Sequence, residues 1–236
     1  MTDIPKFPMD SLSGPYDHEI IEPSSANTIP LRHIMKRLCD IVIGVLLVIM
    51  FLPLMLLIAG LSYGLNGGNV LFAHRRVGKD GNEFNCLKFR TMVDDAEERL
   101  ADILANDPKA AKEWEVKQKL RRDPRILPGV GHFLRQSSLD ELPQIINVLL
   151  GDMSLVGPRP VVQSEMAHYG HFAKLYYSVR PGLTGPWQIG GRSECDFATR
   201  VKLDVNYINN WTFFGDIKIL ASTAFMVLRL RSSSAY

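Results

Sequence analysis

The longest pattern in the sequence is an uncharged apolar run that extends over residues 41–65. Leucine, isoleucine, valine and methionine fill all sides of a helix drawn through this run rather than a single stripe. A helix that spans a bilayer needs about 20 apolar residues, whereas the helices of a soluble protein usually keep one polar face. The run therefore predicts a helix that inserts into a membrane.

Pro53 and the charges beside the run decide which kind of membrane helix is expected. Pro53 lies at the centre, where it removes a backbone donor and kinks a helix. Basic residues flank both ends, and such clusters stay on the cytoplasmic side. A helix that enters, breaks at Pro53 and returns keeps both clusters inside, whereas a kinked spanning helix exports one. We expect the re-entrant, monotopic form over residues 31–66, with the spanning helix as the alternative.

The more polar remainder predicts a small cytosolic domain over residues 67–236. Strand patterns over 70–92 flank the turn signal Lys79-Asp80-Gly81-Asn82, so a β-hairpin is expected. A helix is expected over 94–121, interrupted near Asn106-Asp107-Pro108, where proline disfavours a continuous helix. The fold class is therefore α+β and mostly helical, with a β-hairpin and interfacial amphipathic helices beside the re-entrant membrane helix.

Two further helical regions and two irregular stretches complete the domain. Residues 162–179 are expected to be helical, and residues 197–231 to form two helical pieces around Gly215. The stretches 151–160 and 180–192 are rich in glycine and proline, so loops are expected there.

Composition narrows the classes of partner and compartment. The net charge of the 236 residues is +2, too small to indicate a nucleic-acid partner. The three cysteines lack paired metal spacing and are expected to be reduced, on the cytosolic side of the membrane. Residues 1–30 mix acidic residues with proline and serine and lack the basic start and apolar core of a signal peptide, so a flexible tail is expected.

Two adjacent carboxylates, Asp140 and Glu141, lie where a helix is expected to start. Ser138 as N-cap with Glu141 three residues on forms a capping box, but Pro143 then falls inside the first turns. With Asp140 as N-cap, Pro143 is the third helical residue, where its missing N–H costs little. Both registers place the carboxylates at the positive end of the helix dipole. The pair is thus either a structural cap or a catalytic group.

Basic residues surround this pair in the sequence. Phosphate chemistry requires fixed positive charge and free backbone N–H groups, which glycine-rich loops can offer. A rigid turn is the simpler interpretation of each loop. The basic residues expected to bind phosphate are Lys88, Arg90, Arg135, Arg159, Arg180 and Arg192. The sequence holds no Walker A loop, no Rossmann fingerprint and no Gly-x-Ser-x-Gly elbow. The patterns alone therefore indicate a membrane-bound protein that handles phosphate and depends on an acid.

Several strings, in order from about residue 31 onward, resemble the bacterial sugar transferase family of monotopic polyprenyl-phosphate glycosyl-1-phosphate transferases. These strings are Lys36-Arg37-Leu38-Cys39-Asp40, Phe84-Asn85-Cys86-Leu87-Lys88-Phe89-Arg90-Thr91-Met92, Ser138-Leu139-Asp140-Glu141-Leu142-Pro143-Gln144, Gly151-Asp152-Met153-Ser154-Leu155-Val156-Gly157-Pro158-Arg159-Pro160, Arg180-Pro181-Gly182-Leu183-Thr184-Gly185 and Leu203-Asp204-Val205.

The resemblance implies a Mg²⁺-dependent reaction in two steps. The family's nucleophile matches Asp140, which attacks the sugar-bearing phosphate of a UDP-sugar and expels UMP. The phosphosugar on Asp140 then passes to a polyprenyl phosphate. Glu141 matches a glutamate that helps with acid–base work or with the metal. Lys88, Arg135 and Asp204 match further active-site residues; we expect Asp140 and Asp204 to bind Mg²⁺ and Gln188 to join the substrate-binding set.

Within the family, the sequence is most similar to the ExoY-type galactose phosphotransferases. The expected function is transfer of galactose-1-phosphate from a UDP-sugar to undecaprenyl phosphate, the first membrane step of exopolysaccharide repeat-unit synthesis. The alternatives are the same reaction with UDP-glucose and a non-enzymatic membrane scaffold of a polysaccharide assembly complex. The expected place is the bacterial inner membrane, in contact with its lipids, with the catalytic domain on the cytoplasmic face. The oligomeric state is open, with a homo-oligomer among the options.

Overall fold

The computed structural model describes residues 29–117, 120, 123–189 and 197–233. Two residues of the tail expected over 1–30 fall within these ranges. The chain divides into two compact units. Unit 1 consists of Met1–Leu47, Arg75–Asn85 and Ile145–Tyr236, and unit 2 consists of Val48–His74 and Cys86–Gln144.

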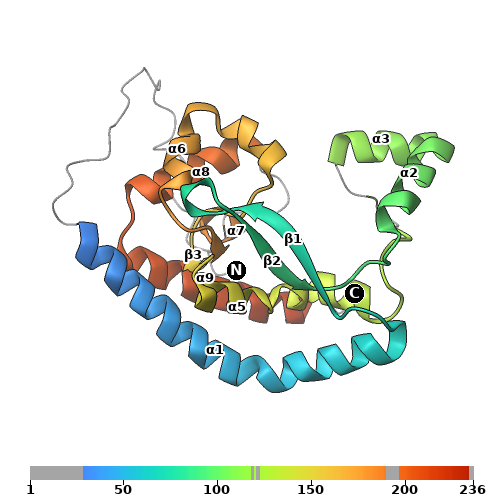
Figure 1. Ribbon diagram of the computed structural model, residues 1–236, viewed down its shortest axis with the longest axis horizontal. Coiled ribbons are helices and arrows are strands. Elements are labelled where there is room, and N and C mark those ends of the chain that lie inside the picture. The colour runs from blue at the N-terminus through green and yellow to red at the C-terminus, as the bar shows by residue number, and fades with distance from the viewer. Residues whose placement is uncertain (1–28, 118–119, 121–122, 190–196, 234–236) are drawn as a thin grey trace. The chain divides into compact units, whose positions relative to one another are not determined.

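The apolar run forms one helix, α1 (Ile29–Asn66), which Figure 1 draws in blue to cyan. Pro53 lies inside it, so the division into two helices expected at Pro53 is not seen. A proline removes one backbone hydrogen bond, and an apolar helix can continue past that loss. The re-entrant arrangement stays a prediction.

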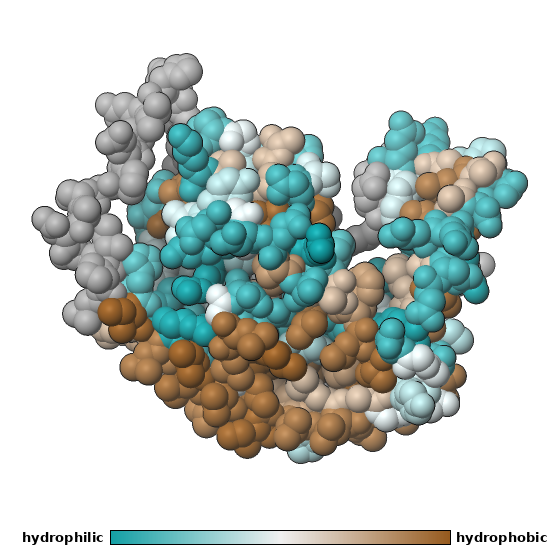
Figure 2. Space-filling model, in the orientation of Figure 1, coloured by the Kyte–Doolittle hydropathy of each residue, from teal (hydrophilic) through white to brown (hydrophobic). Residues whose placement is uncertain are grey.

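The surface of α1 is hydrophobic along most of its length, as the brown atoms in Figure 2 show. The segment Arg32–Asn66 is long and apolar enough to cross a membrane, and 11% of its most apolar window is buried. A core helix of a soluble protein would be mostly buried. Side chains that are at least half exposed include Ile34, Met35, Leu38, Val42, Leu46, Ile49, Met50, Leu56 and Leu57. A surface of this kind is typical of contact with lipid or with another protein.

The expected β-hairpin is confirmed. Strands β1 (Leu71–Val77) and β2 (Glu83–Phe89) form a two-stranded sheet, joined through the short 3₁₀ turn η2 (Lys79–Gly81). Asp80 and Gly81 have φ values of 59° and 77° in this turn. Aspartate and glycine tolerate that left-handed backbone better than most residues, which is why the Asp-Gly pair predicted the turn.

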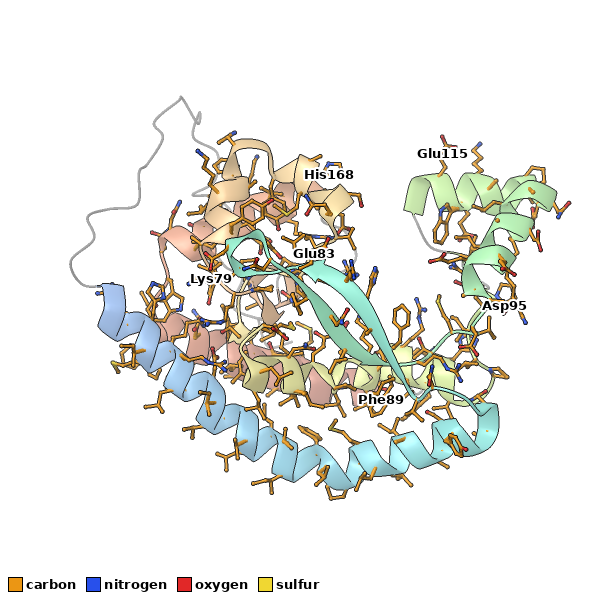
Figure 3. The ribbon with its side chains drawn as sticks, viewed as in Figure 1. Lys79, Glu83, Phe89, Asp95, Glu115 and His168 are labelled. Carbon is orange, nitrogen blue, oxygen red and sulfur yellow. The ribbon has the colours of Figure 1, made fainter. Side chains whose placement is uncertain are left out.

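Unit 2 has an apolar core that includes the last residue of strand β2. Ile58 of α1, Phe89 of β2 and Leu134 of α4 (Val130–Ser137) are buried against one another. Figure 3 labels Phe89 at the end of β2. This core holds Lys88, the residue before Phe89, in a defined position on its strand.

Helices α2 (Ala96–Asn106) and α3 (Pro108–Lys117) confirm the interruption expected near Asn106-Asp107-Pro108. The carboxylate of Asp107 accepts hydrogen bonds from the backbone N–H groups of Lys109 and Ala110 and so caps α3. Asp95, just before α2, and Glu115 on α3 mark this pair of helices in Figure 3.

Unit 1 contains a parallel strand pair that the sequence analysis missed. Strand β3 (Ser154–Val156) pairs with β4 (Gly182–Thr184), with Ser154 opposite Gly182 and Val156 opposite Thr184. Strands of three residues are too short to show an alternating pattern. A Cβ on Gly157 would lie 2.6 Å from the Arg180 carbonyl oxygen, so the backbones approach one another closely here.

Several helices accompany this strand pair in unit 1. They are α5 (Gln144–Leu150), the 3₁₀ segment η4 (Gln163–Phe172), α6 (Ala173–Tyr177), α7 (Pro186–Ile189), α8 (Phe197–Asn209) and α9 (Phe213–Ser233), of which α9 contacts both strands. The expected helix over 162–179 is divided at Gly170, whose φ is 50°. The two helices expected over 197–231 are seen as α8 and α9, with Gly215 inside α9 rather than between them. The core of this unit is built on Val77, Val161, Met166, Tyr169, Tyr176 and Val201.

The close approach of β3 and β4 predicts that Gly182→Ala destabilises the protein. A Cβ on Gly182 would overlap the backbone nitrogen of Gly157, and neither backbone can move without breaking the strand pair. We expect a loss of about 3 kcal/mol in the free energy of unfolding, measured by thermal or denaturant unfolding in lipid nanodiscs. Gly60→Ala on α1 is the control, because its Cβ meets nothing within 4 Å. Equal stability of the two variants would contradict the prediction.

Candidate active site

The carboxylate pair Asp140-Glu141 lies on a short 3₁₀ turn, η3 (Leu139–Glu141), between α4 and α5. Neither expected helix register is seen: Ser138 ends α4 in the left-handed region, with φ 56°, and α5 begins after Pro143. A left-handed residue other than glycine costs roughly 1 kcal/mol and is concentrated at functional sites. The two carboxylates therefore lie in a strained turn and not within a regular α-helix.

Lys88 approaches this turn from β2. Its ammonium group lies 2.6 Å from Oε1 of Glu141, and both side chains are partly buried. Lys88 and Arg135 also act electrostatically on Asp140, and both lower its pKa. The structure thus brings together four of the residues expected in the site: Lys88, Arg135, Asp140 and Glu141.

Burial raises the pKa of Asp140 to about 6, since the ionised carboxylate loses contact with water. The attraction of Lys88 opposes this shift, and repulsion by Glu141 adds to it. At neutral pH the carboxylate is therefore mostly ionised but more basic than an exposed aspartate. A partly buried, ionised carboxylate beside two cations is suited to attack an electrophile that carries negative charge.

Arg90 binds other groups of the protein within unit 2. Its guanidinium donates to Asp94 and to the backbone carbonyl of Gly67, and the side chain is buried. Gly68, with φ 65°, leaves room for this contact, because a Cβ there would lie 3.1 Å from the guanidinium. Phosphate binding by Arg90 stays a prediction.

A second group of expected residues lies in unit 1. The guanidinium of Arg159 lies 5.1 Å from the ring centre of Trp187, and Gln188 is buried beside Trp187 in α7. Arg200 of α8 lies over the same ring at 4.4 Å. The sequence analysis did not single out Trp187 or Arg200. A cation that stacks on an aromatic ring shows no short spacing in the sequence, because its partner can come from any element.

Asp204 is fully buried on α8 in unit 1. Its Oδ2 accepts a 2.8 Å hydrogen bond from the hydroxyl of Tyr169, and its Oδ1 has no hydrogen-bond partner among the described residues. Burial raises the pKa of Asp204 to about 7, although the bond from Tyr169 and the charges of Arg200 and Arg159 lower it. Such a carboxylate can hold a proton near neutral pH.

Arg180 binds protein backbone in unit 1. Its Nε donates to the Gly151 carbonyl at 2.7 Å. Arg37 of α1 donates to two carbonyls at the same end of α5, those of Val148 and Leu149, at 2.6 and 2.9 Å. Two arginines thus satisfy carbonyl groups at the negative end of α5. Phosphate binding by Arg180 stays a prediction, and Arg192 lies outside the described residues.

The residues near Asp140 fit a magnesium ion better than Asp204 does. Mg²⁺ usually binds one or two carboxylates together with substrate phosphates, and keeps several waters. Asp140 and Glu141 supply such carboxylates, whereas Asp204 is fully buried and bonded to Tyr169. The described residues contain no group of three acidic, histidine or cysteine side chains that could hold the ion without substrate. Metal binding by Asp140 and by Asp204 stays a prediction.

Comparison with known proteins gives consistent matches. The family model described as bacterial sugar transferase matches residues 31–230. The exopolysaccharide production protein ExoY of Sinorhizobium fredii is 44% identical over 204 residues, which are 86% of this chain and 90% of that protein. The undecaprenyl-phosphate galactose phosphotransferase of Salmonella typhimurium is 45% identical over 216 residues, which are 91% of this chain and 45% of that protein.

A relative named for glucose is more distant. The UDP-glucose:undecaprenyl-phosphate glucose-1-phosphate transferase of Klebsiella pneumoniae is 38% identical over 203 residues, which are 83% of this chain and 40% of that protein. The chain thus spans less than half the length of the Salmonella and Klebsiella relatives and most of the length of ExoY.

The raised pKa of Asp140 predicts that Asp140→Asn makes the protein more stable at pH 7.5. Folding raises this pKa from 3.8 to about 6, so the ionised carboxylate opposes folding; the cost appears as pH rises above about 4 and is complete above about 6. Removing the charge should raise the free energy of unfolding by up to about 3 kcal/mol at pH 7.5 and by much less at pH 4.5.

Thermal unfolding of the purified protein at both pH values measures this gain. Glu115→Gln, which removes an exposed carboxylate on α3, is the control and should change little. An Asp140→Asn protein that is no more stable than the wild type at pH 7.5 would show that the carboxylate is not held in a desolvated site.

Proposed function

The chain belongs to the bacterial sugar transferase family, and we propose that it transfers a hexose-1-phosphate from a UDP-sugar to undecaprenyl phosphate, with release of UMP. The observation that carries the proposal is Asp140: a partly desolvated carboxylate on a strained turn, with Lys88 and Arg135 acting on it. The 44% identity to ExoY, over 86% of this chain, supports a role in exopolysaccharide synthesis.

The proposed reaction has two displacements at one phosphorus atom. An oxygen of Asp140 attacks the phosphate that carries the sugar, the bond to the α-phosphate breaks, and UMP leaves with that electron pair. An oxygen of the polyprenyl phosphate then attacks the same phosphorus, and the bond to Asp140 breaks. The product is a polyprenyl diphosphate sugar, and the carboxylate is regenerated. Covalent catalysis of this kind divides one difficult transfer into two easier ones.

The residues beside Asp140 have separate tasks in this proposal. Lys88 holds Glu141 and places positive charge where phosphate charge develops, and Arg135 adds a second cation. Glu141 assists by proton transfer or by holding the metal. Mg²⁺ bound near Asp140 would neutralise diphosphate charge and help UMP to leave.

Galactose is the proposed sugar. The Salmonella relative, named for galactose transfer, is 45% identical, whereas the Klebsiella relative, named for glucose transfer, is 38% identical. The proposed site is the cytoplasmic face of the bacterial inner membrane, with α1 inserted in the lipid, because α1 carries an exposed apolar surface. A scaffold without activity would have no use for a buried nucleophile that opposes folding.

The first test measures UMP release by the purified protein in nanodiscs with Mg²⁺. With undecaprenyl phosphate present, UDP-galactose should give continuous release, and UDP-glucose much less. Without the acceptor, release should stop at about one UMP per enzyme, and a labelled sugar should stay on the protein. Asp140→Asn should abolish both signals, while Glu115→Gln keeps them. Release that does not depend on the acceptor, or that survives Asp140→Asn, would refute the proposed mechanism.

The second test uses the pH dependence of kcat/KM, which reports the free enzyme. Because the ionised form of Asp140 attacks, kcat/KM should fall about tenfold for each pH unit below about 6. Lys88 lowers the pKa of Asp140 and Glu141 raises it. The acid limb should therefore move to higher pH in Lys88→Met and to lower pH in Glu141→Gln. Shifts in the same direction would mean that Asp140 does not set the limb.

A further inference from the structure

One turn of α1 carries polar side chains that face the interior of unit 1. Asp40 is 5% exposed and Lys36, one turn earlier, is half-buried, although their neighbours Met35 and Leu38 are at least half exposed. Moving a charged group out of water costs free energy, so charged side chains are buried only where hydrogen bonds or ion pairs compensate the loss. The turn is therefore attached to the globular part by specific polar contacts.

These contacts end on the backbone of β3. Oδ1 of Asp40 accepts a 3.0 Å hydrogen bond from the N–H of Leu155. Nζ of Lys36 donates to the carbonyl of Val156 at 3.0 Å, and the hydroxyl oxygen of Tyr207 lies 3.1 Å from the same carbonyl oxygen. A carboxylate and an ammonium group, one helical turn apart, thus hold two successive residues of one strand.

The ammonium group of Lys36 is itself held in place. It lies 2.5 Å from Oδ2 of Asp216 on α9. Tyr207 donates to Oδ1 of Asp216 at 2.8 Å, and Nε1 of Trp211 donates to Oδ2 at 2.9 Å. Each oxygen of this carboxylate has a partner, so Lys36 cannot move without breaking the network.

Arg159 follows β3 by three residues, with little freedom between. Gly157, directly after Val156, lies so close to the chain opposite that a Cβ would come within 2.8 Å of the Gly182 nitrogen. The carbonyl oxygen of Arg159 lies 3.3 Å from the hydroxyl of Tyr176, which also lies 3.0 Å from the carbonyl oxygen of Val77, and the guanidinium of Arg159 lies over Trp187. A shift of β3 along α1 would therefore move the backbone that carries Arg159.

We propose that Lys36 and Asp40 are positioning residues, which fix β3 on the membrane helix and thereby set the place of Arg159. They touch no substrate in this proposal and act through the strand. The proposal rests on the proposed function and adds to it the phosphate contact by Arg159 that the sequence predicts. Fixing β3 on α1 places this cation at a constant depth relative to the lipid from which the acceptor phosphate is presented.

The test compares Asp40→Ala with Asp40→Asn in nanodiscs. Asp40→Ala removes the acceptor for Leu155 N–H, and kcat/KM should fall about 10- to 100-fold, as expected for a group displaced by about 1 Å. Asp40→Asn keeps an amide oxygen at the same place and should stay within about threefold of the wild type. Asp107→Ala, which removes a carboxylate that caps backbone N–H groups of α3, is the matched control and should be silent.

A double-mutant cycle separates positioning from general destabilisation. In an Arg159→Ala background, Asp40→Ala should cost less than about threefold, because the group that Asp40 positions is gone. Equal losses in both backgrounds, or equal losses in Asp40→Asn and Asp40→Ala, would overturn the proposal. Tyr207→Phe, which removes the hydroxyl that lies against both Val156 and Asp216 and keeps the ring, should show the same coupling on a smaller scale and serves if Asp40→Ala does not fold.

Hydrogen exchange tests the proposal without activity. Peptides over residues 153–161 should exchange faster in Asp40→Ala than in the wild type, and as slowly as the wild type in Asp40→Asn and Asp107→Ala. Unchanged exchange over this segment in Asp40→Ala or Tyr207→Phe would overturn the proposal. A wild type that turns over no UDP-sugar but shows the expected exchange would instead refute the proposed function and leave the attachment of β3 intact.

Discussion

The ion pair between Lys36 and Asp216 is the interaction on which the arrangement of unit 1 depends. It joins α1 to α9, and through Tyr207 and Val156 it reaches α8 and β3. Desolvating two charges costs several kcal/mol each, so such a pair persists only where every remaining donor and acceptor is satisfied. The phenol of Tyr207 and the indole of Trp211 supply these bonds. Removal of one partner would leave a charge buried without compensation.

A balance of opposing effects sets the pKa of Asp140, which is partly buried, and of Asp204, which is fully buried. Desolvation raises the pKa of both, to about 6 for Asp140 and about 7 for Asp204. Lys88 on β2 and Arg135 on α4, both in unit 2, act electrostatically on Asp140, and the turn that carries Asp140 is strained. Asp204 is instead bonded to Tyr169 within an aromatic core. The same residue type thus lies among cations at one place and bonded inside an aromatic core at the other.

Local signals predicted part of this structure and long-range contacts decided the rest. The hairpin follows from Asp80-Gly81, and the break between α2 and α3 follows from Pro108; both depend on a few adjacent residues. The long apolar helix was expected from length and composition, but the preferred interpretation divided it at Pro53, where the structure continues one helix. The left-handed Ser138 was not predicted, because serine seldom adopts a positive φ and the sequence carries no glycine there to signal one.

The candidate site shows the same division. The family resemblance identified Asp140, Glu141, Lys88 and Arg135, which the structure brings together within unit 2. They gave Arg90 and Arg180 the same weight, although both donate to backbone carbonyls. A motif records which residue is needed and not whether a ligand or the protein itself binds it. Trp187 and Arg200 were missed because stacking contacts leave no pattern in the chain.

The sequence separation of Lys36 and Asp216 also sets an order of events during synthesis. The two residues are 180 positions apart, so α1 leaves the ribosome long before its partner on α9 is made. Contacts between residues this far apart in sequence form late in folding. With α1 inserted in the lipid as proposed above, Lys36 and Asp40 remain hydrated at the membrane surface during that interval, where their charges oppose deeper burial of the helix. In that proposal the nascent chain reaches the bilayer first and assembles its globular part on a helix that is already in place.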